Sequence, residues 1–173
     1  MNKRKIKMVG YVFIILLICT ISVSAEWRTF SSKDEMTGKT TWFAHSSQVT
    51  STEEMNFPYS GTKAWLGVGT DGDDEWTYIG FSTKPNITDD ETQDGYSVIR
   101  TRVKWDDEIE QMTFTQDWGS KFIHFRHKKT AISKIEDSNT VLVELNWYGE
   151  GKVYFRFSLD GSAAAIEKIR NAF

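Results

Sequence analysis

Three cationic side chains occupy every second position in one stretch of the sequence: Arg100, Arg102 and Lys104. Apolar residues alternate with them at Ile99, Val103 and Trp105. Successive side chains of a β-strand point to opposite faces, so the pattern predicts a strand with a row of cations on one face. Such a row suits the docking of an acidic partner or an anionic component of a cell envelope. The alternative, which the pattern alone favours, is a solvated face or an edge strand that its charges protect against further pairing.

Four acidic residues lie close together further upstream: Asp71, Asp73, Asp74 and Glu75. Clustered carboxylates are ligands for hard cations such as Ca²⁺, but the glycine and glutamate spacing of an EF-hand loop is absent. Asp and Gly are also required for turn geometry alone. We therefore predict a polar hairpin turn here, with a calcium site as the less favoured alternative. The second acidic run, residues 89–94, is interpreted in the same way.

The three histidines, His45, His124 and His127, are the remaining candidates for metal ligation or catalysis. His124 and His127 would share a face only on a helix, and the cations around them would repel a metal ion. No nucleophile elbow, phosphate-binding loop or zinc-protease motif is present. We predict no metal site, no cofactor and no catalytic residue. A secreted hydrolase stays as an alternative, because one sequence does not reveal a catalytic triad.

The first residues predict a secretory signal peptide, residues 1–25. Four basic residues precede an apolar run, residues 8–21, and Val23 and Ala25 suit a cleavage site before Glu26. The apolar run is shorter than the about 20 residues that a membrane-spanning helix needs, so an uncleaved anchor is the less favoured alternative. Cys19, the only cysteine, follows a bulky isoleucine and is not expected to carry a lipid.

Cleavage there leaves residues 26–173, 148 residues that make one ordinary domain. This part has no cysteine, so its own core and not disulfides must stabilise it. It carries 17 basic and 24 acidic residues, a net charge of −7. Phosphate neutralisation supplies most nucleic-acid affinity, so an acidic domain without a long basic tract excludes nucleic acid as a partner.

Strand-like alternation recurs along this domain. The clearest example is a hairpin, in which residues 141–147 and 153–159 flank the turn Tyr148-Gly149-Glu150-Gly151. Residues 85–95 are polar and acidic, which predicts a loop. Further strands are predicted over residues 40–45, 64–68, 76–81, 96–105 and 111–115.

The apolar period changes at the end of the chain. After Asp160-Gly161-Ser162, apolar residues recur every three or four positions, at Ala163, Ile166, Ile169 and Phe173. This predicts a helix with one apolar stripe. Asp160 or Ser162 is expected to cap it, and Lys168 and Arg170 suit its C-terminal dipole. The predicted fold class is therefore mostly β: an antiparallel, β-sandwich-like single domain with a C-terminal α-helix.

The order of these features resembles the VasI/TagO-type family of exported proteins associated with type VI secretion. The resembling segments are Trp27 with residues 32–39, the strand pair around Leu66 and Ile79, residues 98–103, 122–123 and 155–161, and the helical residues 165–166 and 169–172. Members usually carry one cysteine after the first core strand and another at the C-terminus. Gly69 and Phe173 stand at the corresponding positions here. The resemblance implies a secretion-related envelope protein, and a phage-borne or orphan envelope protein fits as well.

We therefore expect an exported, non-catalytic binding or accessory protein, periplasmic or secreted, with a protein partner in the cell envelope. It would contact the membrane only through its signal segment. The alternative to this function, besides a hydrolase, is a secreted glycan-binding module. In such a module an exposed Trp42 or Trp118 would stack on sugar rings, although core packing is the favoured interpretation of both.

Overall fold

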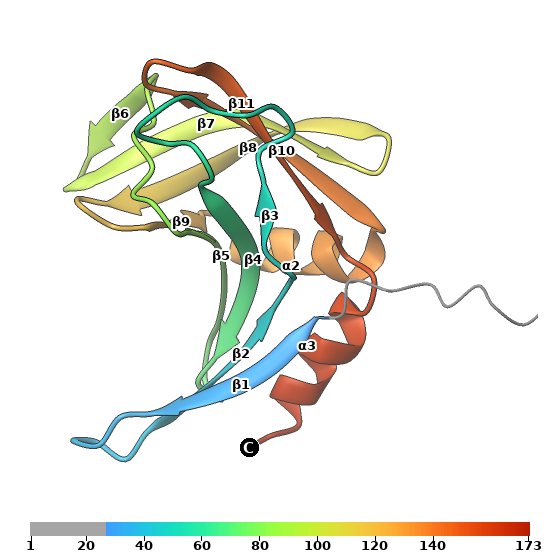
Figure 1. Ribbon diagram of the computed structural model, residues 1–173. Helices are drawn as coiled ribbons and strands as arrows, with labels where there is room; N and C mark the ends of the chain where they lie inside the picture. The colour runs from blue at the N-terminus through green and yellow to red at the C-terminus, as the bar shows by residue number, and fades with distance from the viewer. Residues whose placement is uncertain (1–26) are drawn as a thin grey trace, which may run out of the picture.

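The computed structural model describes residues 27–173, and the predicted signal peptide with its cleavage site lies outside the described residues. No helix in this described part is long and apolar enough to span a membrane. The elements follow one another as β1 (Arg28–Lys33), β2 (Thr40–His45), β3 (Val49–Thr50), β4 (Lys63–Thr70), β5 (Glu75–Phe81), β6 (Asp90–Gln93), β7 (Tyr96–Trp105), β8 (Glu108–Asp117), β9 (Phe122–Phe125), α2 (Lys128–Asp137), β10 (Thr140–Trp147), β11 (Gly151–Ser158) and α3 (Ser162–Arg170) (Figure 1).

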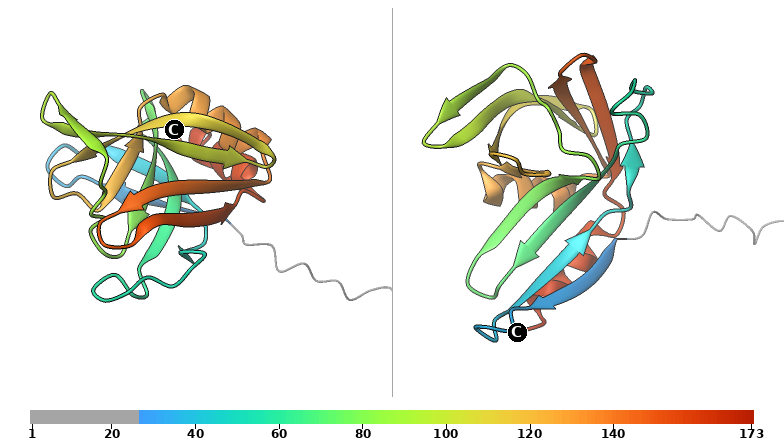
Figure 2. Two further views of the ribbon diagram at one scale, coloured as in Figure 1. Left: turned by 90° about the horizontal axis from the view of Figure 1, so that it is seen from above. Right: turned by 60° about the vertical axis from the view of Figure 1, so that its left-hand side comes forward.

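All described strands belong to one antiparallel sheet, which curls until its two halves face each other. The strand order is β1-β2-β4-β5-β9-β8-β7-β10-β11, with β3 paired to β4 and β6 paired to β7. Val49 of β3 pairs with Ala64 of β4, and Ser51, directly after β3, bridges to Phe155 of β11. These contacts bring β11 to the neighbourhood of β4, although the two lie far apart in the strand order. Figure 2 shows the curl from two further sides.

Aromatic side chains join the two halves across the interior. Phe81 of β5 packs edge-on against Trp147 of β10 and Phe155 of β11, with ring centroids 5.7 and 5.5 Å apart. All three side chains are fully buried. The predicted mostly β, sandwich-like single domain is therefore confirmed, with the difference that one curled sheet supplies both layers.

Strands with strict alternation lie where the sequence predicts them. β2 and β7 have the predicted bounds, and β10 and β11 form the predicted hairpin with Val141 opposite Phe157. β8 is longer than predicted at both ends. The loop predicted over residues 85–95 was wrong in part, because β6 lies within it. The four residues of β6 are all exposed, and they form a strand by pairing with the edge of β7 rather than by burying apolar side chains.

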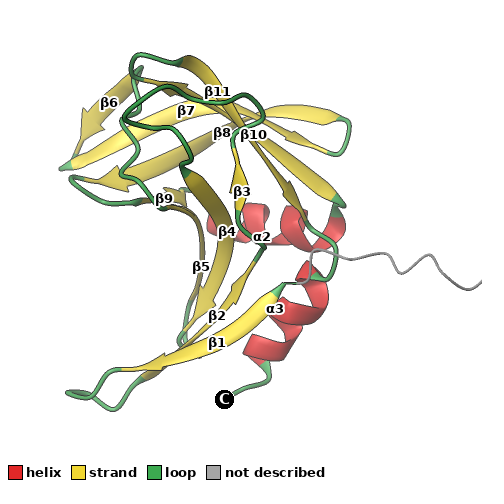
Figure 3. Ribbon diagram, in the orientation of Figure 1, coloured by secondary structure: helices red, strands yellow, loops and turns green. Residues whose placement is uncertain are grey.

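Two helices cover the inner side of the β4–β5 region (Figure 3). α3 is the predicted C-terminal helix, whereas α2 was not predicted. α2 buries Ala131, Ile132 and Ile135, and α3 buries Ala165, Ile166 and Ile169, all within the same core as Leu66 and Ile79.

The start of α3 differs from the sequence prediction. Gly161 occupies the N-cap in the left-handed conformation, with φ of 83°, and no side chain caps the helix. The Ser162 hydroxyl instead donates a hydrogen bond to the Ile135 carbonyl of α2, at 2.6 Å. Because this contact turns Ser162 inward, the buried stripe runs through Ser162, Ala165, Ile166 and Ile169. Ala163 and Phe173, which were predicted to belong to the stripe, are exposed.

Replacement of Trp147 tests whether the interior rings hold the two halves together. Trp147→Ala should lower the free energy of unfolding by about 3–5 kcal/mol, because a large buried side chain is lost and the core relaxes only in part. The matched control is Tyr148→Ala, since the neighbouring ring is 63% exposed and its loss should change stability by less than about 0.5 kcal/mol. Urea unfolding followed by circular dichroism measures both. Equal midpoints for the two variants would contradict the assignment.

Candidate functional site

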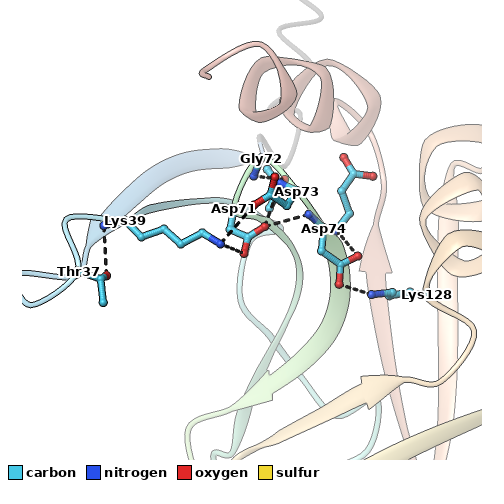
Figure 4. Close-up of polar contacts among 9 residues, drawn as sticks. Thr37, Lys39, Asp71, Gly72, Asp73, Asp74 and Lys128 are labelled. Atoms are coloured by element: carbon cyan, nitrogen blue, oxygen red, sulfur yellow. Dashed lines mark hydrogen bonds and ion pairs between the residues drawn. The ribbon is translucent and has the colours of Figure 1, made fainter.

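Two lysines from other parts of the fold form ion pairs with the acidic turn between β4 and β5 (Figure 4). Lys39 Nζ donates to Asp71 at 2.7 Å, and Lys128 of α2 pairs with Asp74. The Asp71 carboxylate also accepts the backbone N–H groups of Asp73 and Asp74, at 3.1 and 2.9 Å. The Lys39 hydrogen bond, together with these, lowers the pKa of Asp71 to about 2.

The last member of the acidic run is held by α3. Arg170 forms an ion pair with Glu75, its Nε lying 2.6 Å from Oε1, and its Nη1 pairs with Glu136 of α2 at 2.5 Å. Within residues 27–173 no group of three potential ligands is arranged to hold a metal ion. We therefore assign Asp71, Asp73, Asp74 and Glu75 to turn geometry and to ties between elements.

The predicted row of cations lies on the outer face of β7, with Ile99, Val103 and Trp105 buried on the other side. Each cation has an acidic neighbour. Arg100 pairs with Glu91 at 2.7 Å, and Lys104 pairs with Asp107 at 3.3 Å. Arg102 forms a two-pronged contact with Glu144 of β10, in which Nε lies 3.1 Å from Oε1.

Glu144 is the centre of this cluster. Its side chain is only 9% exposed, and it also accepts a hydrogen bond from the Tyr154 hydroxyl at 2.9 Å and lies 3.4 Å from Lys152 Nζ. The Arg102 hydrogen bonds, followed by that of Tyr154, hold the pKa of Glu144 below its usual value despite the opposing effect of burial. The Glu144 carboxylate of β10 thus contacts side chains of both neighbouring strands, β7 and β11.

β11 adds two cations that the sequence analysis did not assign to this row. Leu142 of β10 pairs with Lys104 of β7 on one side and with Arg156 of β11 on the other, so all three side chains share one face. Lys152 reaches the same face through Glu144. We call this surface the basic face; it consists of Arg100, Arg102, Lys104, Lys152 and Arg156.

Apolar side chains lie among these cations. Ile109 of β8 is opposite Lys104 and is 63% exposed, and Leu142 is partly exposed beside it. A small pocket of about 100 Å³ opens here, lined by Arg102, Lys104, Ile109, Leu142, Glu144 and Tyr154. The basic face therefore combines charge with exposed apolar area.

A second surface lies on the outer side of β4 and β5, where glycines alternate with aromatic residues. Three successive cross-strand pairs join Trp65 with Gly80, Tyr78 with Gly67, and Trp76 with Gly69. A Cβ atom at Gly80 would lie 2.5 Å from Cε2 of Trp65, and one at Gly69 would lie 2.6 Å from Cε2 of Trp76. The rings thus occupy the space that a side chain on the opposite strand would need.

Rings from the neighbouring strands extend this surface. Phe43 and His45 of β2 lie opposite Gly69 and Gly67, and Phe122 of β9 lies opposite Gly80. Phe30 of β1 stacks on Phe43 with centroids 5.2 Å apart, and His124 of β9 contacts Tyr78. We call this surface the aromatic face; it consists of Phe30, Phe43, His45, Trp65, Trp76, Tyr78, Phe122 and His124.

The polar groups of the aromatic face are neutral at physiological pH. His45 Nε2 hydrogen-bonds to the Tyr78 hydroxyl. Burial lowers the pKa of His45 to about 4 and raises the pKa of Tyr78 well above its usual value. Burial also lowers the pKa of His124. The hydrogen bond between His45 and Tyr78 joins a ring of β2 to a ring of β5.

The remaining site candidates are separated from one another. His124 lies in β9, whereas His127 is the exposed N-cap residue of α2. Trp42 packs against the core, whereas Trp118 is 81% exposed in the β8–β9 turn. Lys84 Nζ lies 5.8 Å from the Trp118 ring, beside a polar pocket of about 300 Å³.

Comparisons with known proteins add no relative: no family model, no curated protein and no solved structure matches this chain. The resemblance to the VasI/TagO-type proteins stays a prediction, and function must be inferred from the surfaces themselves.

The half-buried His45 predicts a specific dependence of stability on pH. Its pKa is about 4 in the fold and 6.5 in a model peptide. Between these values the unfolded chain binds a proton that the folded chain does not, so stability falls as the pH drops from 6.5 to 4. The full shift corresponds to roughly 3 kcal/mol, which the partial exposure of the ring to solvent reduces. We expect His45→Gln to lose less stability than the wild type over this window.

Urea midpoints at pH 7, 6, 5 and 4 measure the effect. The control is His127→Gln, which removes an exposed histidine outside the aromatic face. Carboxylates that titrate near pH 4 act on all three proteins alike, so the difference between the curves reports His45. Parallel curves for the wild type and His45→Gln would show that the assignment is wrong.

Proposed function

We propose that this chain is an exported, non-catalytic binding protein of the cell envelope, which holds an acidic protein partner on its basic face. The observation that carries the proposal is the apolar pair of exposed Ile109 and partly exposed Leu142 among five cations. Surfaces that bind only phosphate or lipid headgroups need charge alone. Protein interfaces are enriched in Arg and Tyr and bury an apolar centre within a polar rim, and Arg102 and Tyr154 flank such a centre here.

The charge distribution supports an acidic partner. Residues 26–173 carry a net charge of −7, yet the outer face of β7 and β11 concentrates five cations. Of their acidic neighbours, Asp107 and Glu91 are highly exposed, with side-chain exposures of 102% and 70%. Exposed pairs of this kind are weak and exchange readily with solvent or with another carboxylate. A partner that presents its own carboxylates can therefore displace Asp107 and Glu91 from the cations. The same cations attract such a partner to this face.

Arg102 has a different role from its neighbours. Its partner Glu144 is buried, and removal of Arg102 would leave an unpaired buried carboxylate. Arg102 thus belongs to the framework of the face, and Lys152 lies against the same buried carboxylate. Lys104, whose neighbour Asp107 is fully exposed, and Arg156 are the cations most available to a partner. Mutations that test binding should consequently leave Arg102 in place.

Export follows from the first 25 residues and is tested by the mature N-terminus. We expect the protein recovered from the periplasm or medium of its native cell to begin at Glu26, as N-terminal sequencing and intact mass would show. An intact N-terminus in the membrane fraction would indicate an uncleaved anchor instead. A start at Cys19 would indicate a lipoprotein.

Charge reversal tests the basic face. Lys104→Glu combined with Arg156→Glu should reduce partner recovery about tenfold or more, because like charges then oppose the partner. The protein is expressed with a C-terminal tag in its native cell, cross-linked in the envelope and captured, and bound proteins are identified by mass spectrometry. The resemblance to secretion-associated proteins makes secretion components the first candidates.

The matched control reverses two cations outside the basic face, Lys33 of β1 and Lys168 of α3, and so produces the same net charge. We expect this control to recover the same dominant partner as the wild type. Equal recovery by the basic-face variant would contradict the proposal. Recovery of anionic lipid without a protein would show that the basic face binds the membrane surface and not a protein partner.

A further inference from the structure

We infer that the aromatic face is a second binding surface, which takes the pyranose rings of a glycan by stacking. This inference does not depend on the basic face or on the protein partner proposed for it. It rests on three features: the glycines on which the rings lie, the polar groups beside them, and the position of the two helices on the opposite side of the sheet.

The rings of the aromatic face are fixed before any ligand arrives. Trp65, Tyr78 and Trp76 each lie over a glycine of the neighbouring strand, and that glycine leaves room for the ring to settle close to the backbone. Their neighbours contact them edge-on: Phe122 lies 6.2 Å from Trp65 and 5.5 Å from Tyr78, between ring centroids. A surface that is already ordered gives up little conformational entropy on binding.

The rings are recessed rather than protruding. Phe30 and Phe122 are the most exposed, at 44% and 39%, while the others are half-buried or, at Tyr78, buried. Anchors of protein interfaces usually insert into a pocket of the partner. A row of recessed rings matches a flat ligand better, and the C–H groups on one side of a pyranose present such a flat, weakly positive face to the negative face of an aromatic ring.

The composition of the surface also fits a sugar. All eight members are aromatic, and His45 and Tyr78 are held neutral by burial. At one end a pocket of about 610 Å³ joins Phe30, His45 and Trp65 to the polar groups of Arg28, Ser47 and Gln48. A pyranose stacked on the rings would direct its equatorial hydroxyls sideways, toward donors and acceptors of this kind.

The extent of the surface suits an oligosaccharide rather than one sugar. Its rings come from five adjacent strands, β1, β2, β4, β5 and β9. Strands lie about 4.8 Å apart, so the row spans about 19 Å. Several sugar rings in sequence can lie on it.

No described element covers this side of the sheet. α2 and α3 contribute to the core with Ala44, Leu66, Val68 and Ile79, which alternate with the members of the aromatic face. The helices therefore occupy the opposite side. In Figure 1 they lie to the right of β4 and β5, and in the right-hand view of Figure 2 no helix or strand lies in front of these two strands.

The test titrates the purified exported protein with four probes: cellohexaose, chitohexaose, mannohexaose and a muropeptide digest of bacterial cell wall. Intrinsic tryptophan fluorescence and isothermal titration calorimetry report binding. We expect saturable binding of at least one probe by the wild type. Phe30→Leu combined with Phe122→Leu should weaken that binding at least tenfold, because two exposed rings are lost while apolar side chains remain.

Two controls separate this surface from others. Trp118→Leu removes the exposed indole beside the other polar pocket and should leave sugar binding unchanged. The Lys104→Glu and Arg156→Glu variant should also bind the sugar like the wild type, so that failure of the partner proposal and failure of this one are distinguishable. Thermal unfolding confirms that each variant is folded.

Several results would overturn the inference. Absence of binding to all four probes would do so, and so would binding that survives the loss of both phenylalanines. Loss of binding in Trp118→Leu alone would move the site to the β8–β9 turn. A wild-type dimer in sedimentation experiments that the phenylalanine variant dissociates, without sugar binding, would show that a second copy of the chain covers the face.

Discussion

The β4–β5 ladder is the interaction on which the rest of the structure depends. On its inner side Leu66 pairs with Ile79, and both are fully buried. On its outer side every pair joins a glycine to a ring. Because strand residues alternate strictly between faces, the same register places the aliphatic residues under the helices and the rings on the opposite surface. A shift of one residue would exchange the two sets, so core packing and the aromatic face are fixed together.

The charged residues tie other elements to the end of this ladder. The turn that closes it, residues 71–74, is held by Lys39 of the β1–β2 turn and Lys128 of α2, while Glu75 is held by Arg170 of α3. Each contact is at least partly exposed and contributes little alone. Together they connect a β-turn and two helices to one hairpin, in a domain without cysteine. In the sequence these carboxylates resemble a metal site. In the fold they form ion pairs with lysine and arginine side chains of the same chain.

The parts of the fold that were predictable are those with a local pattern. β7, β10 and β11 alternate over eight or more residues, and the row of Arg100, Arg102 and Lys104 follows directly from that alternation. α2 has only three buried positions, Ala131, Ile132 and Ile135, after a polar start, which is too short a stripe to stand out. β6 has no buried residue, so only its pairing with β7 makes it a strand.

The features of the two surfaces were less predictable because they depend on partners distant in sequence. Glu144 is 42 residues from Arg102, and no local signal connects them. The aromatic face did leave a signal, since Trp65 and Gly67 alternate with Leu66 and Val68, and Tyr78 and Gly80 alternate with Ile79. That alternation shows that rings and glycines share the side away from the core. Which glycine lies under which ring depends on register, and register is set by the turn between the strands.

A partly exposed aromatic face that reaches the edge strand β1 carries a risk of aggregation, and the edges of this sheet limit that risk. β1 is the free edge beside the aromatic face. It is short, with Arg28 and Lys33 at its two ends, and all residues between them except Phe30 are polar. Charged, short edge strands resist pairing with another chain. At the other end of the strand order, β11 is covered in part by the segment after β3, where Thr52 donates its N–H to the Tyr154 carbonyl. Both ends of the strand order are therefore poor templates for a further strand, although rings of the aromatic face lie beside one of them.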